Sequence, residues 1–227
     1  MSELEIRPLE EGDIGAVARM QHHGWHDYYA QYSFYPIVRR SVTVTGLESE
    51  WREFLRAGSG TGAGPLIVGR ERQAYVAVEG SRICGVAAVS SYVEGKWPPV
   101  DALLRQPDGH LRPTAKFQEL YITPDLRGAG IGHYLTIARA DWALARGYEA
   151  IFLTTFGGAT KTITFHQKNG LKLVHEYQSM QQYEGGLRVP IVCFLDLDLA
   201  AFRARMAGAL EEKLRSGRGR AAEVRLQ

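Results

Sequence analysis

The stretch that most constrains the fold is a strand, a glycine-rich turn and a helix in direct succession. Residues Phe117 to Thr123 are aromatic and branched and end at Pro124-Asp125, which predicts a strand and a turn. Glycines follow at 128, 130 and 132, and apolar residues then recur at helical spacing from His133 to Arg146. The first amides of a helix lack internal partners and lie at the positive end of its dipole, so they bind anionic oxygens. We therefore predict that this turn is a diphosphate cradle, a set of backbone amides that bind the two phosphates.

The turn can be compared with three known types of phosphate-binding loop. A P-loop needs a lysine followed by Ser or Thr, but the chain has Ile131-Gly132-His133 there. A dinucleotide fingerprint needs Gly-x-Gly-x-x-Gly near the start of a parallel sheet, and the spacing here is Gly128-x-Gly130-x-Gly132. The remaining type is the run Arg127-Gly128-Ala129-Gly130-Ile131-Gly132, which resembles the coenzyme A pyrophosphate loop of the GNAT acetyltransferase superfamily.

The surroundings of the loop strengthen this resemblance. The run from Glu119 to Leu126 is similar to the family's fourth strand and connecting turn, and Phe165 to Leu171 is similar to its closing helix and turn. The resemblance implies an α+β fold, in which helices flank a mostly antiparallel central sheet that is splayed between strands 4 and 5. We expect those two strands at Lys116–Thr123 and Tyr148–Thr155.

The remaining elements follow from pattern. A chain of 227 residues with 45% hydrophobic and 23% charged content is long and apolar enough to bury a sizeable core. We expect one acetyltransferase-like domain over residues 1–200, with an aromatic helical insertion at about 28–56 and a glycine-rich link at 57–64. A helix at Leu199–Arg215 and a loose basic tail complete the chain, so that residues 201–227 lie outside this domain. The four prolines between Val93 and Pro113 predict a loop.

The aromatic insertion has two interpretations. Its rings either pack on the sheet or form a wall of the acceptor pocket, and one residue can do both. The side chains concerned are Tyr28, Tyr29, Tyr32, Phe34, Tyr35, Trp51 and Phe54.

Other sites receive little support. His22, His23 and His26 lack neighbouring ligands for a metal, so we expect no metal site. Cys84 and Cys193 lie in strand-like apolar runs, and we expect reduced core residues in a cytoplasmic protein. A net charge of +2 argues against nucleic acid, and no apolar run is long enough to span a membrane.

The resemblance implies a coenzyme site. Backbone groups of Leu120, Tyr121 and Ile122 would pair with the pantetheine arm of acetyl-CoA like an added strand. Its diphosphate would lie on the amides of Arg127, Gly128, Ala129, Gly130, Ile131 and Gly132. Lys168 is a candidate for a further phosphate contact, although a lysine on a helix surface is more often simply solvated.

Two candidates remain for the chemistry. Glu119 is the candidate base, where related enzymes place an acid, with an ordinary strand-end glutamate as the alternative. His166 replaces the family's usual tyrosine and is the candidate proton donor, with a structural or solvated histidine as the alternative. Ala159 replaces a helix-start asparagine that the pattern expects.

The function that the resemblance implies is acyl-CoA-dependent N-acyl transfer to an amine. Acetyl from acetyl-CoA would pass directly to a primary amine of a small molecule or peptide within a ternary complex, and a homodimer is compatible with this. The alternative from another class is a sensor that binds acetyl-CoA without turnover, which the changes at His166 and Ala159 keep open. A third possibility is a nucleic-acid binder that uses the basic tail, with salt-dependent binding.

Overall fold

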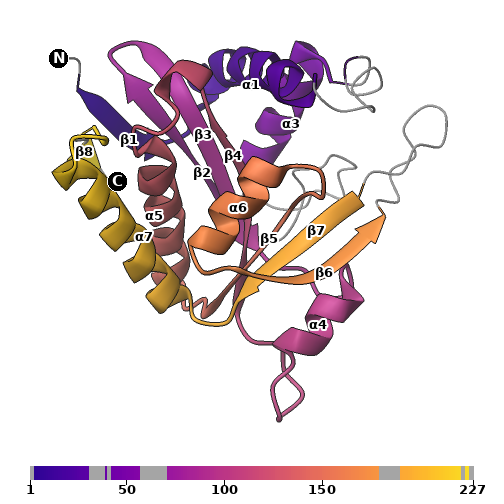
Figure 1. Cartoon of the computed structure of the whole chain (residues 1–227). Helices are drawn as coiled ribbons and strands as arrows, with labels where there is room; N and C mark the ends of the chain where they lie inside the picture. Colours follow the sequence, from indigo (N-terminus) through magenta and orange to yellow (C-terminus); the bar gives the residue numbers. More distant parts are fainter. Residues whose placement is uncertain are drawn as a thin grey trace.

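One mixed sheet organises the molecule, and its strands lie in the order β6-β7-β5-β4-β3-β2-β1-β8 (Figure 1). The computed structural model describes residues 3–30, 39, 42–56, 71–178, 190–220 and 223–224. The strands are β1 (Leu4–Pro8), β2 (Arg72–Glu79), β3 (Arg82–Ser91), β4 (Thr114–Ile122), β5 (Ala150–Phe156), β6 (Lys172–Gln178), β7 (Pro190–Asp196) and β8 (Glu223–Val224).

Most neighbours in this sheet are antiparallel. β1 to β4 form an antiparallel meander, and β5, β7 and β6 form an antiparallel second part. The parallel neighbours are β4 with β5, and β1 with the short β8. The expected fold class, a mostly antiparallel sheet flanked by helices, is confirmed.

Helices cover both faces of the sheet (Figure 1). They are α1 (Ile14–Tyr29), α3 (Val44–Leu55), α4 (Pro98–Leu104), α5 (Ile131–Leu144), α6 (Thr160–Lys168) and α7 (Leu199–Arg215), with 3-10 turns at Glu11–Asp13 and Pro124–Leu126. Side chains of α1 and α3 share one core with β2 and β3, whereas α5 and α7 bury theirs against the opposite face. Within the described residues, no helix is long and apolar enough to cross a membrane.

The aromatic insertion is described in part. Trp51 and Phe54 of α3 are buried in the core that α1 shares with the sheet, as the packing interpretation predicts. Tyr29 is buried too, and its ring lies 5.0 Å from that of Phe156 at the end of β5. The side chain of Tyr28, residues Tyr32, Phe34 and Tyr35, and the link at 57–64 lie outside the described residues.

The segment between β3 and β4 corrects a prediction. We expected a loop over 93–113, but residues Pro98–Leu104 form α4. The prolines occupy the first helical positions, where a missing N–H costs nothing. Trp97, Val100 and Leu104 then bury one face of α4 over β5 and β7. The prolines start this helix rather than prevent it.

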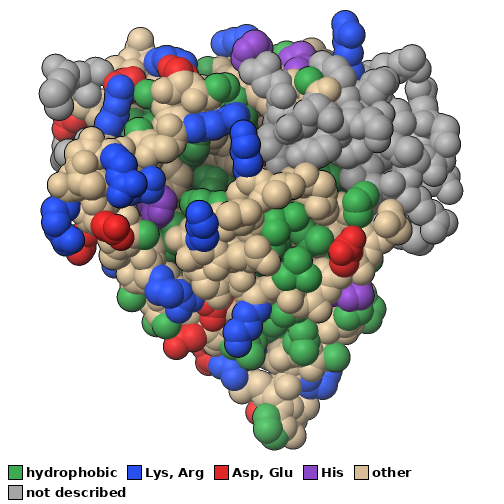
Figure 2. All heavy atoms as spheres, in the orientation of Figure 1, with side chains coloured by type: hydrophobic (Ala, Val, Ile, Leu, Met, Phe, Trp, Pro, Cys, Tyr) green, Lys and Arg blue, Asp and Glu red, His purple; other side chains and the backbone are tan. Residues whose placement is uncertain are grey.

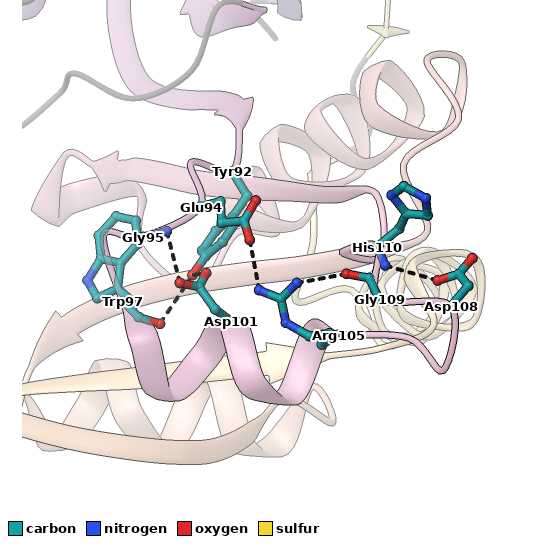
Figure 3. Close-up of polar contacts among 9 residues, drawn as sticks. All are labelled: Tyr92, Glu94, Gly95, Trp97, Asp101, Arg105, Asp108, Gly109 and His110. Atoms are coloured by element: carbon teal, nitrogen blue, oxygen red, sulfur yellow. Dashed lines mark hydrogen bonds and ion pairs between the residues drawn. The ribbon is translucent and has the colours of Figure 1, made fainter.

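Polar contacts hold α4 in place (Figure 3). The carboxylate of Asp101 accepts hydrogen bonds from the Tyr92 hydroxyl at 2.7 Å and from the Gly95 amide at 2.9 Å. Arg105 pairs with Glu94 at 2.8 Å and donates to the Gly109 carbonyl at 2.7 Å. The segment is thus fixed at both ends, and it covers the half of the sheet that carries β5.

The C-terminal helix α7 packs on α5. Phe202, Met206 and Leu210 bury their side chains in the core that α5 covers, and Arg203 pairs with Asp141 of α5 at 2.8 Å. Beyond α7, residues Glu223–Val224 pair with β1 in parallel. The described part of the expected tail therefore runs back along the sheet.

Candidate active site

The central feature is a V between β4 and β5. Their parallel pairing begins at Thr114↔Ala150 and ends at Phe117↔Leu153. Beyond that rung β4 stays paired with β3 to Ile122, and β5 stays paired with β7 to Phe156. The two halves of the sheet therefore separate. This is the expected splay, and it leaves two facing strand edges open to a ligand.

A β-bulge lies where the V opens. Ala88 of β3 pairs with Gln118 and Ala87 pairs with Leu120, so Glu119 is the extra residue. Its φ of +39° is the one positive value for a non-glycine in the described chain. Because the bulge breaks the alternation, the side chains of Gln118 and Glu119 both contact groups on the α1 side, through Ser90 and Gln21 respectively.

Arg139 of α5 holds this bulge from the opposite face. Its Nη1 donates to the carbonyls of Gln118 at 3.0 Å and Ala88 at 3.3 Å, and Nη2 donates to the Thr136 hydroxyl at 3.0 Å. The side chain is 3% exposed, and burial lowers its pKa to about 9. Arg139 therefore supplies donors for strand carbonyls that an irregular ladder leaves available.

The carboxyl group of Glu119 is desolvated, although part of the residue's surface is exposed. Gln21 Nε2 donates to its Oε2 at 2.6 Å. Burial, with a smaller contribution from the nearby carboxyl of Glu50, raises the pKa of Glu119 to about 7. Lys116 and the Gln21 hydrogen bond act in the opposite direction. Glu119 thus titrates where a general base is most effective.

Lys116 is the second buried ionisable group on this side of β4. It is 6% exposed, and its Nζ lies 4.6 Å from the ring centre of Trp97 and 3.4 Å from Gln118 Oε1. Burial, and then the charge of Lys96, lower the pKa of Lys116 to about 7. Strand β4 therefore carries two buried ionisable groups with pKa values of about 7, Lys116 just before the V opens and Glu119 just after.

The glycine loop offers unused donors. Among the described residues, the backbone N–H groups of Gly128, Gly130, Ile131 and Gly132 donate to no protein acceptor. Gly130, with a φ of +93°, is the N-cap of α5 and provides no side-chain cap. Free amides at an uncapped helix start are able to bind an anion.

Two amides in the expected cradle are already used. Arg127 donates to Pro124 O at 3.3 Å, and Ala129 donates to Leu126 O at 3.4 Å. The Arg127 side chain donates from Nε to Ile122 O at 3.1 Å and lies 5.6 Å from the ring centre of Tyr121. Arg127 thus provides a cation beside the loop, rather than an amide in it.

Helix α7 supports the loop from outside. Lys213 Nζ donates to Gly128 O at 3.2 Å, and the Arg220 amide donates to Ala129 O at 2.9 Å. Leu210 Cδ1 lies 3.1 Å from the position that a Cβ on Gly130 would take. These polar contacts occupy carbonyl groups of the loop and none of its free amides.

His166 lies in the last turn of α6 and is enclosed. The residue is 9% exposed, and its ring lies 5.4 Å from that of Phe194. Burial, with a smaller effect from Arg139, lowers the pKa of His166 to about 4. Burial also lowers the pKa of His133, in the first turn of α5, to about 4. Both imidazoles are therefore neutral at neutral pH.

The other predicted residues fall in three places. Leu120 and Ile122 pack their side chains on the α5 side, and Tyr121 packs on the α1 side against Gly24, where a Cβ would lie 1.8 Å from the ring. Ala159 is buried at the start of α6, while Lys168 is exposed at its far end. The phosphate contact of Lys168 stays a prediction.

The space-filling view shows a hollow between the start of α5 and α6 (Figure 2). Apolar side chains form its floor, and Lys and Arg side chains lie around its rim. A separate shallow pocket of about 500 Å³ lies between α1 and the ends of β3 and β4, lined by Met20, His23, Arg82 and Tyr121 among others. The described residues include no group of three His, Cys, Asp or Glu side chains that could hold a metal.

Comparison with known proteins decides the family. A sequence model described as the Acetyltransferase (GNAT) family matches residues 25–171. The chain belongs to this family. The match covers the last residues of α1, the bulged strand β4, the glycine loop and α6, and therefore includes both strands that form the V. No curated protein matches the sequence.

Solved GNAT-type structures share the fold. An N-acetyltransferase from Staphylococcus aureus Mu50 is 18% identical with a TM-score of 0.58, over 87% of this chain and 99% of that one. A ribosomal-protein-alanine N-acetyltransferase from Brucella melitensis is 14% identical with a TM-score of 0.57, over 85% and 98%. A chimera of the spermidine N-acetyltransferase SpeG from Vibrio cholerae and hSSAT is 14% identical with a TM-score of 0.54, over 88% and 98%. At these identities the likeness establishes the fold alone.

The sequence alone assigned no role in this candidate site to Gln21, Lys116 or Arg139, and it predicted Trp51 only as part of the aromatic insertion. Gln21 was recognisable only as one member of the buried face of α1. Lys116 and Arg139 are charged residues within apolar runs, a pattern that signals a buried charge with a specific role.

Proposed function

We propose that the protein is an acetyl-CoA-dependent N-acyltransferase that transfers acetyl directly to a primary amine of a small molecule or peptide. The observation that carries this proposal is the coincidence of the V with a desolvated carboxyl group. Pairing of β4 and β5 ends at Phe117↔Leu153, and Glu119 follows two residues later on β4. A ligand that pairs with β4 in the V therefore passes beside Glu119.

The chain fits the coenzyme. The open edge of β4 beyond Phe117, including Leu120, Tyr121 and Ile122, can pair with the amides of a pantetheine arm. The free amides of Gly128, Gly130, Ile131 and Gly132 can bind a diphosphate, with the Arg127 guanidinium beside them. When bound, acetyl-CoA supplies the acetyl group as a thioester.

Glu119 provides the base. An amine enters as the ammonium ion at neutral pH and attacks only after it loses a proton. A carboxylate with a pKa of about 7 accepts that proton far better than an exposed glutamate with the ordinary value of 4.5. Its ionised form is abundant at neutral pH, so the base is both available and strong enough.

Other groups of the chain would stabilise the negative charge that develops on the thioester during transfer. Backbone N–H groups of β4 near Tyr121 and Ile122 are the donors for negative charge on the carbonyl oxygen. His166, with a pKa of about 4, holds no extra proton at neutral pH and can contribute at most a hydrogen bond from its neutral ring. The proposed acid role of His166 is thus reduced to hydrogen bonding.

The acceptor would approach from the α1 side, where Glu119 meets Gln21. Tyr29 of α1 contacts Phe156 of β5, so aromatic rings span the open end of the V and suit an acceptor with an apolar part. Two proteins of similar structure are named as a ribosomal-protein-alanine N-acetyltransferase and a spermidine N-acetyltransferase. Either a peptide or a small amine is therefore a reasonable acceptor to test. A cytoplasmic location and a homodimer remain predictions.

The test is release of free thiol from acetyl-CoA in the presence of a panel of amines, amino acids and peptides. We expect at least one acceptor to give turnover, and Glu119→Gln to abolish most of it. Glu94→Gln, which removes an exposed carboxylate that pairs with Arg105, is the matched control and should be fully active. Thiol release that does not depend on Glu119 would refute its role.

The second candidate is a sensor that binds acetyl-CoA without turnover. The neutral, enclosed His166 in the family's tyrosine position favours it. Calorimetric binding of acetyl-CoA with no thiol release for any amine would establish this second function instead.

A further inference from the structure

A chain of hydrogen bonds connects the candidate base to helix α3. Trp51 Nε1 donates to Gln21 Oε1 at 2.8 Å, and Gln21 Nε2 donates to Glu119 Oε2 at 2.6 Å. Trp51 and Gln21 are 0% and 1% exposed, so water does not compete for these bonds. The three residues come from α3, α1 and β4, and the bonds join all three elements behind the V.

The direction of this chain is fixed by chemistry. An indole N–H can donate but cannot accept, so the oxygen of the Gln21 amide must face Trp51. The NH₂ group of Gln21 must then face Glu119. Carboxylate oxygens accept, so Oε2 receives an N–H from Gln21 whether Glu119 is charged or neutral. A proton on Oε2 would point at that N–H, and protonation is therefore directed to Oε1.

We propose that Gln21 and Trp51 are positioning residues that reserve Oε1 of Glu119 as the proton-accepting atom. This inference rests on the proposed N-acyl transfer. In the step, an N–H bond of the acceptor ammonium breaks, its electron pair remains on nitrogen, and the proton forms an O–H bond with Oε1. The negative charge of Glu119 is neutralised, and Oε2 keeps its hydrogen bond from Gln21 throughout.

The backbone of Glu119 supports this assignment. A non-glycine residue at φ +39° is strained and persists only where the surroundings hold it. Arg139 holds the preceding carbonyl from the α5 face, and Gln21 holds the carboxyl from the α1 face. The side chain is thus fixed from both faces of the sheet, as a base that must meet a nitrogen at one atom requires.

Other charges act on the same carboxyl and must be kept constant in a test. Glu50 of α3 raises the pKa of Glu119, and Lys116 of β4 lowers it. The Gln21 bond also lowers it, because the bond stabilises the ionised form. Removing only the Gln21 donor should therefore raise the pKa of Glu119.

The experiment compares wild type with Gln21→Met, which keeps the length of the side chain and removes its donor. We expect the pKa of Glu119, measured by carbon-13 NMR of the labelled carboxyl, to rise by about one unit. Turnover should fall about tenfold below that pKa and recover only in part at pH 9, because raising the pH restores the ionised form of Glu119 but not the fixed position of its Oε1; KM for acetyl-CoA should be unchanged. Trp51→Phe removes the indole donor and should shift both readouts in the same direction by less, and it serves if Gln21→Met does not fold.

The control is Gln73→Met, since Gln73 donates to the backbone carbonyl of Ala74 and not to Glu119. An unchanged pKa of Glu119 in both Gln21→Met and Trp51→Phe would overturn the inference, as would a loss of turnover that is equal at every pH. The NMR readout needs no turnover. If wild type releases no thiol with any amine but the pKa still depends on Gln21, the proposed function fails while the positioning stands.

Discussion

Arg139 Nη1 lies 3.0 Å from the carbonyl oxygen of Gln118, directly before the bulge at Glu119. The guanidinium comes from α5, on the face opposite to the carboxyl of Glu119. Its Nε has no hydrogen-bond partner, and no carboxylate pairs with it among the described residues. An unpaired buried charge is costly, and the hydrogen bonds to the carbonyls of Ala88 and Gln118 offset part of that cost.

Arg139→Met should therefore destabilise the fold. The variant leaves the carbonyls of Ala88 and Gln118 without the donor they share, and unsatisfied buried acceptors cost about 1–3 kcal/mol each. We expect a loss of about 2 kcal/mol in the free energy of unfolding, measured by urea denaturation, because relief of the buried charge offsets part of the cost. Arg146→Met, at an exposed arginine after α5, should stay within about 0.5 kcal/mol of wild type. A neutral effect of Arg139→Met would contradict this role.

The glycine loop can be tested at Gly132. Its φ is not positive, and a Cβ there would meet no atom closer than Ile122 Cδ1 at 4.0 Å. Gly132→Ala should fold normally but place a methyl group at the free amides, so we expect acetyl-CoA affinity to fall about tenfold in calorimetric titration. Gly130 is less suitable, because its φ of +93° and the nearby Leu210 would disturb the fold as well.

The control for this variant is Gly208→Ala in α7, where a Cβ would meet nothing within 4 Å. It makes the same chemical change in a helix without free amides beside it. Equal affinity for acetyl-CoA in Gly132→Ala and Gly208→Ala would refute the cradle.

The raised pKa of Glu119 links stability to pH. A pKa of about 7 in the folded state against 4.5 for the ordinary group means that folding favours the protonated form. The associated stability is fully present below pH 4.5 and is lost as pH rises through 7. Between these values, wild type should lose up to about 3 kcal/mol relative to Glu119→Gln, which cannot ionise. Denaturant unfolding of both proteins at pH 4.5, 6 and 8 measures this difference, and a constant difference would contradict the raised pKa.

His166 should contribute no limb to the pH profile of turnover. Burial holds its pKa at about 4, so the ring does not titrate between pH 6 and 9. His166→Phe should slow transfer less than about tenfold, leave acetyl-CoA affinity nearly intact, and keep the shape of the profile. If wild type shows an alkaline limb that disappears in His166→Phe, the histidine acts as an imidazolium acid after all.

Much of the fold could be predicted from the sequence because the patterns of neighbouring elements agreed with one another. The Arg127–Gly132 loop, the strand before it and the helix after it each have a strong pattern, and the predicted range Leu199–Arg215 is the observed range of α7. The V follows from the family resemblance, and the register of β4 with β5 confirms it.

The bulge at Glu119 could not be predicted from the sequence. One extra residue shifts the alternation of apolar and polar residues, and the sequence pattern does not show at which residue the shift occurs. In a regular strand, Gln118 and Glu119 would face opposite sides of the sheet. The contact of Glu119 with Gln21 depends on the bulge and therefore could not be predicted either. Helix α4 was missed for a different reason. Four prolines between Val93 and Pro113 predict a loop, but Pro98 and Pro99 occupy the first turn of α4, where proline is well tolerated.

The most direct test of the central claim is a crystal structure of the protein soaked with acetyl-CoA. We expect the diphosphate on the amides of Gly128, Gly130, Ile131 and Gly132, the pantetheine arm paired with β4 beyond Phe117, and the thioester next to Glu119. A coenzyme bound elsewhere, or β4 and β5 paired as far as Ile122 and Phe156, would contradict the claim.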